Sequence, residues 1–232
     1  DALAELLGRT RGDSCATAVS AAGSAAGPVR VAAFDVDGTL TRRDCVVPFL
    51  RQVAGTGVLG RRLAARPVSV ATLARRRDRD GLKAAATEAA FTGQPIDRIE
   101  RLAVEFAESV FATGLRPDTV AELDAHRERG DTVLLVSASF EVYLRPLAEL
   151  LGADDVLAAR LEVADDGFLT GRMVGANCRG PEKVRRLHAW LDEHAGGRGN
   201  AHVTAYGDSP GDRELLGDAD LARWLGRGPM PR

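Results

Sequence analysis

The sequence predicts an α/β protein with a Rossmann-like core, in which a mostly parallel sheet forms the middle of three layers, and with an inserted all-helical cap. Two observations support this fold class. Short apolar runs end in small, acidic or hydroxyl residues, and helical patterns fill the gaps between these runs. Alternating strands and helices favour parallel strands joined by right-handed crossovers. The length of 232 residues suits one sizeable domain, or a core domain that carries a smaller insert.

Three apolar runs are predicted to form buried strands: VRVAAF (residues 29–34), TVLLV (132–136) and HVTAY (202–206). They are followed by DVDGTL, SAS and GDSPGD, respectively. In open parallel sheets, ligands bind beyond the carboxyl ends of the strands. The sequence therefore predicts a functional site where these three polar segments meet.

Helices are predicted over residues 117–129, 140–151 and 181–194, the second of them ended by Gly152. Another helix begins at Pro95, and its apolar face consists of Ile96, Ile99, Leu102, Ala103, Phe106, Val110 and Phe111. Asp166-Gly167 lies between two apolar runs and predicts a β-hairpin.

The segment from residue 41 to about residue 116 is too long for a simple crossover, and its patterns are helical. The expected organisation is a flexible leader (1–28), a core (29–43 and 117–232) and a helical insert (44–116). Residues 42–79 hold ten Arg against two Asp, a net charge of +8, so the rest of the chain must carry −10 to reach the total of −2. This Arg-rich segment is either a solvated face or a surface that attracts a phosphorylated substrate or an anionic membrane.

Composition excludes several classes of protein. The chain is 45% hydrophobic and 28% charged, which is typical of a globular protein and not of a disordered one. It has no run of eighteen apolar residues that could span a membrane. A net charge of −2 offers no general case for nucleic-acid binding. Its three cysteines form no CxxC pair, so neither a disulfide framework nor a zinc site is indicated, and a reducing cytoplasmic location is expected.

Acidic pairs follow the first and third predicted strands, Asp35 with Asp37 and Asp208 with Asp212. Such an inventory of oxygen ligands suits Mg²⁺ together with a phosphate ester. Ser137 can donate a hydrogen bond to a phosphate oxygen, and Lys183 supplies a positive charge beside a helix N-terminus. A calcium loop does not fit, because glycine is fourth in the motif instead of sixth and its twelfth position is not glutamate.

The motifs DVDGTL (35–40), VSAS (136–139), Lys183 and GDSPGD (207–212) together resemble those of phosphatases in the haloacid dehalogenase (HAD) superfamily. The helical insert after the first motif is similar to the first-position cap of that superfamily. The combination resembles its phosphoserine-phosphatase-like branch, subfamily IB. The resemblance covers roughly residues 29–225.

The resemblance implies a role for each matching residue. Asp35 would be the nucleophile that forms an aspartyl-phosphate, and Asp37 the acid that protonates the leaving alcohol and later deprotonates water. The phosphate-binding residues would be Thr39, Ser137, Ala138 and Lys183. The Mg²⁺ site would comprise Asp35, Asp37 through its backbone carbonyl, Asp208 and Asp212, with the last of these binding the metal or supporting its waters.

Two residues could select the substrate. Asp44 lies nine residues after Asp35, where phosphoserine phosphatases carry an acidic residue that contacts the substrate's amino group. It could favour an amine-bearing phosphate, or it could cap the helix expected near Val46. Arg179 could line the pocket or belong to a surface loop. The chain has DGT where phosphoserine phosphatases usually have DST, and SAS where they usually have SGG, and these differences weigh against phosphoserine as the substrate. Some members of this branch act on phospholipid headgroups instead.

The predicted function is therefore a Mg²⁺-dependent phosphomonoester hydrolase that acts through an aspartyl-phosphate. Its partner would be a small phosphorylated metabolite, phosphoserine-like or otherwise amine-bearing, or a phospholipid headgroup, and no nucleic acid. In the second case the Arg-rich cap would contact the membrane surface. Alternatives are a phosphotransferase of the same family and a catalytically silent phosphate-binding module. An intact Asp37 favours phosphate-ester cleavage over cleavage of carbon–phosphorus or carbon–halogen bonds.

Overall fold

A computed structural model describes residues 27–230 except residues 66 and 77. Its strands are β1 (Val29–Phe34), β2 (Thr132–Phe140), β3 (Asp155–Val163), β4 (Leu169–Val174), β5 (Ala201–Gly207) and β6 (Leu221–Trp224). Its α-helices are α2 (Val46–Ala54), α3 (Thr56–Ala64), α4 (Pro67–Arg75), α5 (Arg79–Phe91), α6 (Ile96–Thr113), α7 (Pro117–Glu128), α8 (Glu141–Leu151), α9 (Pro181–His194) and α10 (Arg213–Asp218).

The strands form one sheet in the order β4-β3-β2-β1-β5-β6. Neighbouring strands are parallel, except for the antiparallel pair β3 and β4 at one edge. At the end of the central strand, Phe34 pairs with Leu135 of β2 and with Tyr206 of β5. The polar segments that follow β1 and β5 therefore leave the sheet side by side, next to the Ser137–Ser139 stretch of β2.

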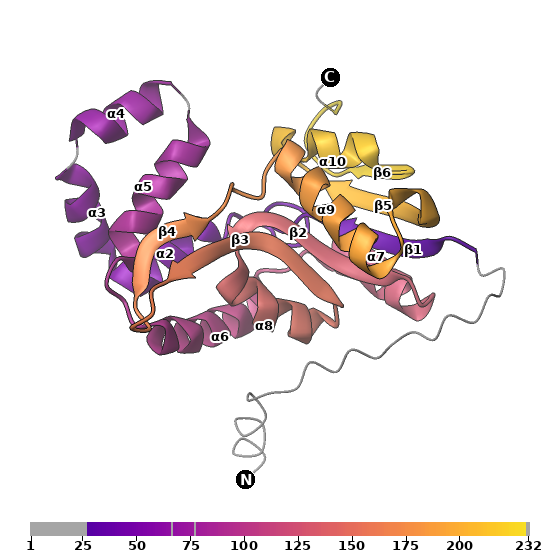
Figure 1. The fold of residues 1–232 in the computed structure, drawn as a ribbon, viewed down its shortest axis with the longest axis horizontal. Helices are drawn as coiled ribbons and strands as arrows, with labels where there is room; N and C mark the ends of the chain where they lie inside the picture. The colour runs from indigo at the N-terminus through magenta and orange to yellow at the C-terminus, as the bar shows by residue number, and fades with distance from the viewer. Residues whose placement is uncertain (1–26, 66, 77, 231–232) are drawn as a thin grey trace, which may run out of the picture.

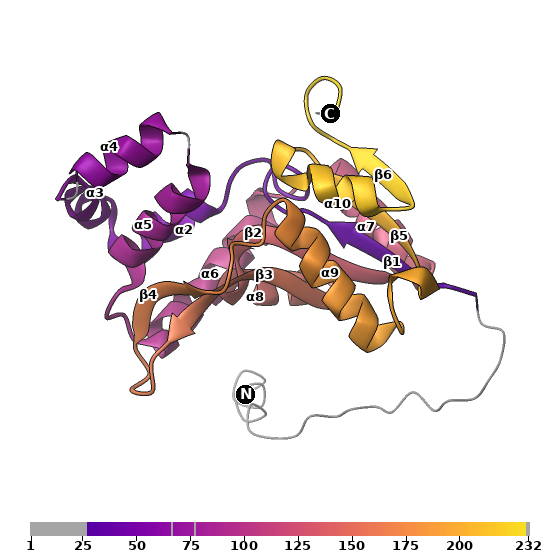
Figure 2. The same cartoon turned by 45° about the horizontal axis from the view of Figure 1, so that its top comes forward.

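The sheet lies between two layers of helices, with α9 and α10 on one face and α6, α7 and α8 on the other (Figures 1 and 2). Successive strand residues point to opposite faces. Accordingly, Val31 and Ala33 belong to the apolar cluster that includes α9, whereas Ala32 and Phe34 belong to the cluster that includes α7 and α8. Burial on both faces explains why residues 31–34 of β1 and 133–136 of β2 are continuously apolar in the sequence.

The helices α2 to α6 lie between β1 and α7 in the chain, and α3 and α4 project away from the sheet (Figure 1). The base of this insert packs on the core through aromatic side chains. Phe49 of α2 lies 4.8 Å from Tyr143 of α8, and Phe91 of α5 lies 5.2 Å from Phe140 of β2, both between ring centroids. This packing holds α2 and α5 over the carboxyl end of the sheet.

The predicted α/β fold class is confirmed. The strand over residues 29–34 and the helix over residues 181–194 have their predicted bounds, and the expected hairpin is the pair β3 and β4. None of the described helices has the length and apolar character needed to cross a bilayer.

Several details of the sequence-based prediction were wrong. The second strand continues to Phe140 instead of ending at Val136, with a shift in its register against β3 after Val136. The edge strand β6 was not predicted, and Phe111, expected on the buried face of its helix, is 42% exposed. Residues 1–26 of the expected leader lie outside the described residues.

Candidate active site

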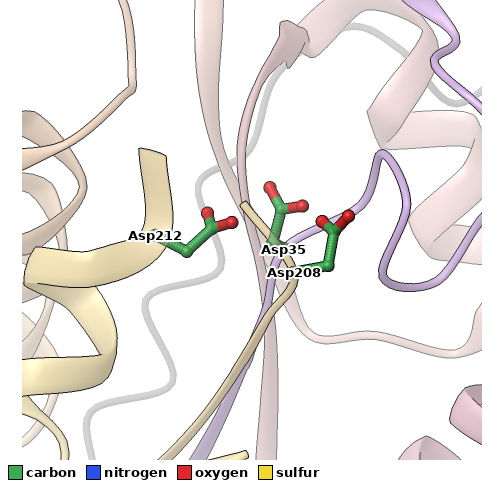
Figure 3. A group of neighbouring side chains, drawn as sticks. All are labelled: Asp35, Asp208 and Asp212. Carbon is green, nitrogen blue, oxygen red and sulfur yellow. The ribbon is translucent and has the colours of Figure 1, made fainter. Parts of the chain in front are cut away.

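Three carboxylates gather at the carboxyl end of the sheet. Asp35 follows β1, Asp208 follows β5, and Asp212 lies in the short turn before α10. Each offers an oxygen within 4.8 Å of the others, and Asp35 lies between the other two side chains in Figure 3. The structure thus brings together three of the four predicted metal-site residues through their side chains. The fourth, Asp37, was expected to contribute its backbone carbonyl, and its carboxylate lies outside this group.

Lys183 pairs with two of these carboxylates. Its Nζ atom lies 2.6 Å from Oδ1 of Asp35 and 2.6 Å from Oδ1 of Asp212. All three residues are buried. Burial raises the pKa of Asp35 to about 7, although Lys183 acts in the opposite direction. Burial alone would lower the pKa of Lys183, but the charges of Asp35 and Asp212 raise it, so the lysine stays protonated.

The charges of this cluster fit a divalent cation. When all three carboxylates are ionised they face one ammonium group, which leaves two negative charges without a neighbouring positive group in the cluster. Buried charges are costly unless they are paired or bind a metal. Mg²⁺ is held by one or two carboxylates, waters and substrate phosphate, and these oxygens are of the type it prefers. Asp35, Asp208 and Asp212 would therefore be the side chains that hold it.

A glycine turn shapes the floor of the site. Gly38 has φ of +87°, and a Cβ atom there would collide with the carboxylate of Asp208. The next residue, Thr39, is buried and donates from Oγ1 to Oδ1 of Asp208, at 3.2 Å. A side chain at position 38 would displace Asp208, so the glycine of the DGT motif serves the carboxylate cluster as well as the turn.

Asp37 lies beside this cluster with both carboxylate oxygens bonded. The backbone N–H of Cys45, just before α2, donates to Oδ1 at 2.9 Å, and Oγ of Ser139 donates to Oδ2 at 2.5 Å. Burial raises the pKa of Asp37, while the hydrogen bond from Ser139 opposes this rise. Asp37 is therefore held in one orientation by β2 and by the residue that precedes α2.

The stretch of β2 that was predicted to bind phosphate lines the same cavity as Asp35 and Asp37. Ser137 is buried, and its Oγ atom accepts a hydrogen bond from the backbone N–H of Ser139 at 3.1 Å. Ser137, Ala138, Lys183 and the carboxylates all line one cavity of about 710 Å³. Thr39 is the exception among the predicted phosphate-binding residues, because it does not line this cavity and bonds Asp208 instead.

The two predicted specificity residues also line the cavity. Asp44 accepts the backbone N–H of Val47 at 3.0 Å and so caps the first turn of α2 through one oxygen. Arg179 precedes α9 and packs beside Gly211. The insert supplies an apolar wall to the same cavity, formed by Val46, Val47, Leu50, Leu63, Leu82, Ala85 and Ala86.

Sequence reasoning missed three side chains at this site: Lys83, Ser139 and Asn177. Ser139 bonds Asp37 as described. Lys83 of α5 donates from Nζ to the carbonyl of Ala138 and to Oδ1 of Asn177, the latter at 2.6 Å. Burial lowers the pKa of Lys83 to about 8, against the opposing effects of Cys178 and Asp37. A signal was present in the sequence, because Lys83 and Lys183 are its two lysines among 31 basic residues.

Buried carboxylates and a lysine at the carboxyl end of a parallel sheet, covered by a helical insert, form a site of the kind in which α/β proteins bind ligands, and its groups suit a hard cation and an anionic ligand. The family model of haloacid dehalogenase-like hydrolases matches residues 32–217. Protein CicA of Caulobacter vibrioides is 39% identical over 188 residues, which make up 81% of this chain and 82% of that protein.

A phosphoserine phosphatase of Polaromonas sp. is 30% identical over 209 residues, covering 83% of this chain and 77% of that enzyme. A crystal structure of a protein with unknown function from Bordetella pertussis superposes with a TM-score of 0.69 at 26% identity, covering 84% of this chain and 89% of that one. The chain therefore belongs to the haloacid dehalogenase-like hydrolases. It is a phosphatase of this family, in the phosphoserine-phosphatase-like branch.

Proposed function

We propose that the protein is a Mg²⁺-dependent phosphomonoester hydrolase that passes through a covalent phosphate on Asp35. The observation that carries this proposal is the placement of Lys183 between Asp35 and Asp212, with Asp208 alongside. A carboxylate nucleophile and a phosphate ester repel each other, so the attack needs positive charge at both. Lys183 supplies one such charge, and the carboxylate cluster would bind another.

In the first step, an oxygen of Asp35 attacks phosphorus, and the bond between phosphorus and the ester oxygen breaks. Asp37 donates its proton to the departing alcohol oxygen. A raised pKa suits this role, because the acid must carry a proton before the reaction. Bound Mg²⁺ would neutralise charge on the phosphoryl group. Ser137 and Lys183 would hold the phosphoryl oxygens, with Ala138 contributing its backbone.

In the second step, Asp37 takes a proton from water, and the water oxygen attacks the phosphorus of the aspartyl-phosphate. The bond between phosphorus and Asp35 breaks, which releases inorganic phosphate and regenerates both carboxyl groups. Ser139 and Cys45 keep Asp37 in place by their hydrogen bonds. Both steps then use the same proton-carrying group, first as acid and then as base.

The substrate we propose is a small phosphorylated metabolite or a phospholipid headgroup. The names of several relatives, as phosphoserine phosphatases, support the first class, and Asp44 would then contact an amino group. The apolar wall and the exposed arginines of the insert, among them Arg61, Arg62, Arg75 and Arg76, support the second. In either case residues 44–116 would act as the cap over a core of residues 29–43 and 117–232, and Arg179 would line the entrance.

We expect the protein to work in the cytoplasm without a nucleic-acid partner, and to reach phospholipid through the surface of the insert. Co-sedimentation with vesicles containing about 30% anionic phospholipid, compared with neutral vesicles, tests this contact. Retention on the anionic vesicles that falls with rising salt supports it, because such binding is electrostatic. Equal recovery in the supernatant from both kinds of vesicle contradicts it.

Phosphate release tests the proposed reaction. The substrates are phosphoserine, phosphoethanolamine, phosphocholine, p-nitrophenyl phosphate and phosphatidylglycerophosphate, each with Mg²⁺ and with chelator. We expect release with Mg²⁺ only, and a loss of roughly 10³-fold or more in kcat for Asp35→Asn. Transfer of phosphate to added alcohols instead of water would identify a phosphotransferase. Binding of phosphate compounds without any turnover would identify a silent module.

A further inference from the structure

The two lysines of this chain lie in the same cavity. The sequence has 31 basic residues, and 29 of them are arginine. Lys183 comes from α9 of the core, whereas Lys83 comes from α5 of the insert, and both line the cavity that contains Asp35 and Asp37. Arginine and lysine differ in shape, since a guanidinium is a broad plane and an ammonium is a compact donor of three hydrogen bonds.

Lys83 lies where a compact ammonium fits. Its Nζ atom donates to the carbonyl oxygen of Ala138 and to Oδ1 of Asn177, and it lies 4.7 Å from the centroid of the Phe140 ring. The ammonium thus has three partners, two oxygens and one aromatic face. An ammonium can direct its donors to partners in different directions, whereas a guanidinium has its donors in one plane.

The carbonyl that Lys83 contacts belongs to a peptide unit that is held at both ends. This unit joins Ala138 to Ser139. Its carbonyl accepts from Lys83, and its N–H donates to Oγ of Ser137 at 3.1 Å. Ser139 then donates from Oγ to Oδ2 of Asp37 at 2.5 Å. The orientation of this one peptide therefore helps to place Ser139, whose hydroxyl holds Asp37.

We propose that Lys83 is a positioning residue for Asp37, which it controls through the Ala138–Ser139 peptide, so that Asp37 is correctly oriented only while α5 rests on the core. This inference rests on the proposed hydrolase function, in which Asp37 is the acid and base. It assigns to the insert a part in proton transfer that is separate from selecting the substrate.

A second contact ties the same helix to the same place. Asp80 lies one turn before Lys83 on α5, and it accepts a hydrogen bond from Nδ2 of Asn177 at 2.7 Å. Both ends of the Asn177 amide are thus bonded to α5, and Asn177 lies in the segment between β4 and α9. Because of these contacts, the position of Lys83 depends on how α5 packs against the core.

The kinetic test compares two leaving groups, because p-nitrophenol leaves without a proton and an alkyl alcohol does not. The values of kcat/KM report the first chemical step for phosphoethanolamine and for p-nitrophenyl phosphate. We expect Lys83→Met to lower kcat/KM by about 10- to 100-fold for the alkyl ester and by much less for the aryl ester, since a general acid contributes roughly 10²–10⁴-fold. Ser139→Ala should show the same selectivity, and the two losses should not add in the double variant.

Equal losses for both esters, or a rise in KM with unchanged kcat, would overturn the inference, because they would indicate a structural role or direct contact with the phosphate. The control is Arg101→Met, which removes a cation from an exposed position on α6. It should leave both esters unaffected.

Amide hydrogen exchange tests the same contact without turnover. Lys83→Met should speed exchange in residues 137–140, while residues 29–34 of β1 and the Arg101→Met variant remain as in the original protein. Unchanged exchange in residues 137–140 would overturn the inference whatever the kinetics show. A protein that releases no phosphate from any ester but shows the faster exchange would refute the proposed function and, with it, the part of the inference concerning proton transfer.

Discussion

The Nζ atom of Lys183 lies 2.6 Å from Oδ1 of Asp35, and the two side chains are only 2% and 9% exposed. The lysine bonds Asp212 at the same distance, so one buried cation holds two buried carboxylates together. The ion pair thereby joins α9 to the residue that follows β1. The pair serves stability and, in the proposed reaction, the attack on phosphorus.

Replacing this lysine tests its structural part. We expect Lys183→Met to lower the free energy of unfolding by roughly 3–5 kcal/mol without Mg²⁺, because two buried carboxylates lose their cation. Urea unfolding measures this loss. Adding Mg²⁺ should recover part of it if the cluster binds the ion, since a ligand of the folded state stabilises it. The matched variant Lys183→Met with Asp35→Asn should also recover part, and unchanged stability of the single variant would contradict the prediction.

Substitution of Gly38 is expected to weaken metal binding, because this residue lies against the carboxylate of Asp208. Gly38→Ala forces a side chain into φ of +87° and against the carboxylate of Asp208. We expect a loss of about 1–2 kcal/mol in stability and a weaker response of activity to Mg²⁺. Gly93→Ala is the control, because Gly93 has φ of +73° but open space around its Cβ position. If both variants respond to Mg²⁺ like the original protein, Gly38 has no part in placing Asp208.

Two substitutions at Asp44 separate helix capping from substrate recognition. Asparagine caps a helix about as well as aspartate, whereas alanine does not. If Asp44 contacts a substrate amine, both Asp44→Asn and Asp44→Ala should raise KM for phosphoethanolamine, by about tenfold for the loss of one charge-assisted contact. KM for p-nitrophenyl phosphate should not change. An asparagine variant with the original KM for both substrates would leave Asp44 as a helix cap alone.

Away from the active site, Asp131 bonds Arg30 and His126, and this network predicts that the stability of the protein falls in acid. Burial by itself raises the pKa of Asp131, but hydrogen bonds from Arg30 and His126 lower it to about 2. Because the folded pKa lies below the unfolded value near 3.8, this contribution to stability is present above about pH 4 and is lost as the pH falls towards 2.

The variant Asp131→Asn tests this network by urea unfolding at several pH values. At pH 7 we expect it to be less stable by about 1 kcal/mol, since Arg30 is exposed and solvent weakens its ion pair. The difference should shrink between pH 4 and pH 2. A difference that stays constant over this range would show that Asp131 does not titrate as stated.

The sequence predicted much of the fold because the central strands are buried on both faces. Continuous apolar runs such as residues 31–34 then stand out, and the parallel arrangement places Asp35 and Asp208 at one edge. The edge strand β6 did not stand out in this way, since three of its four residues are exposed. The extension of β2 beyond Val136 was hidden because SAS resembles a turn in composition.

What the sequence by itself determined is the set of polar residues that follow the apolar parts of three buried strands: Asp35, Asp37, Ser137 and Asp208. Local order is enough to place such residues, because parallel strands end at a common edge. Only the tertiary structure decided that Lys83 reaches Ala138 and that Ser139 holds Asp37. Lys83 and Ala138 lie 55 residues apart in the chain, and their contact depends on how α5 packs on the core, which local patterns do not encode.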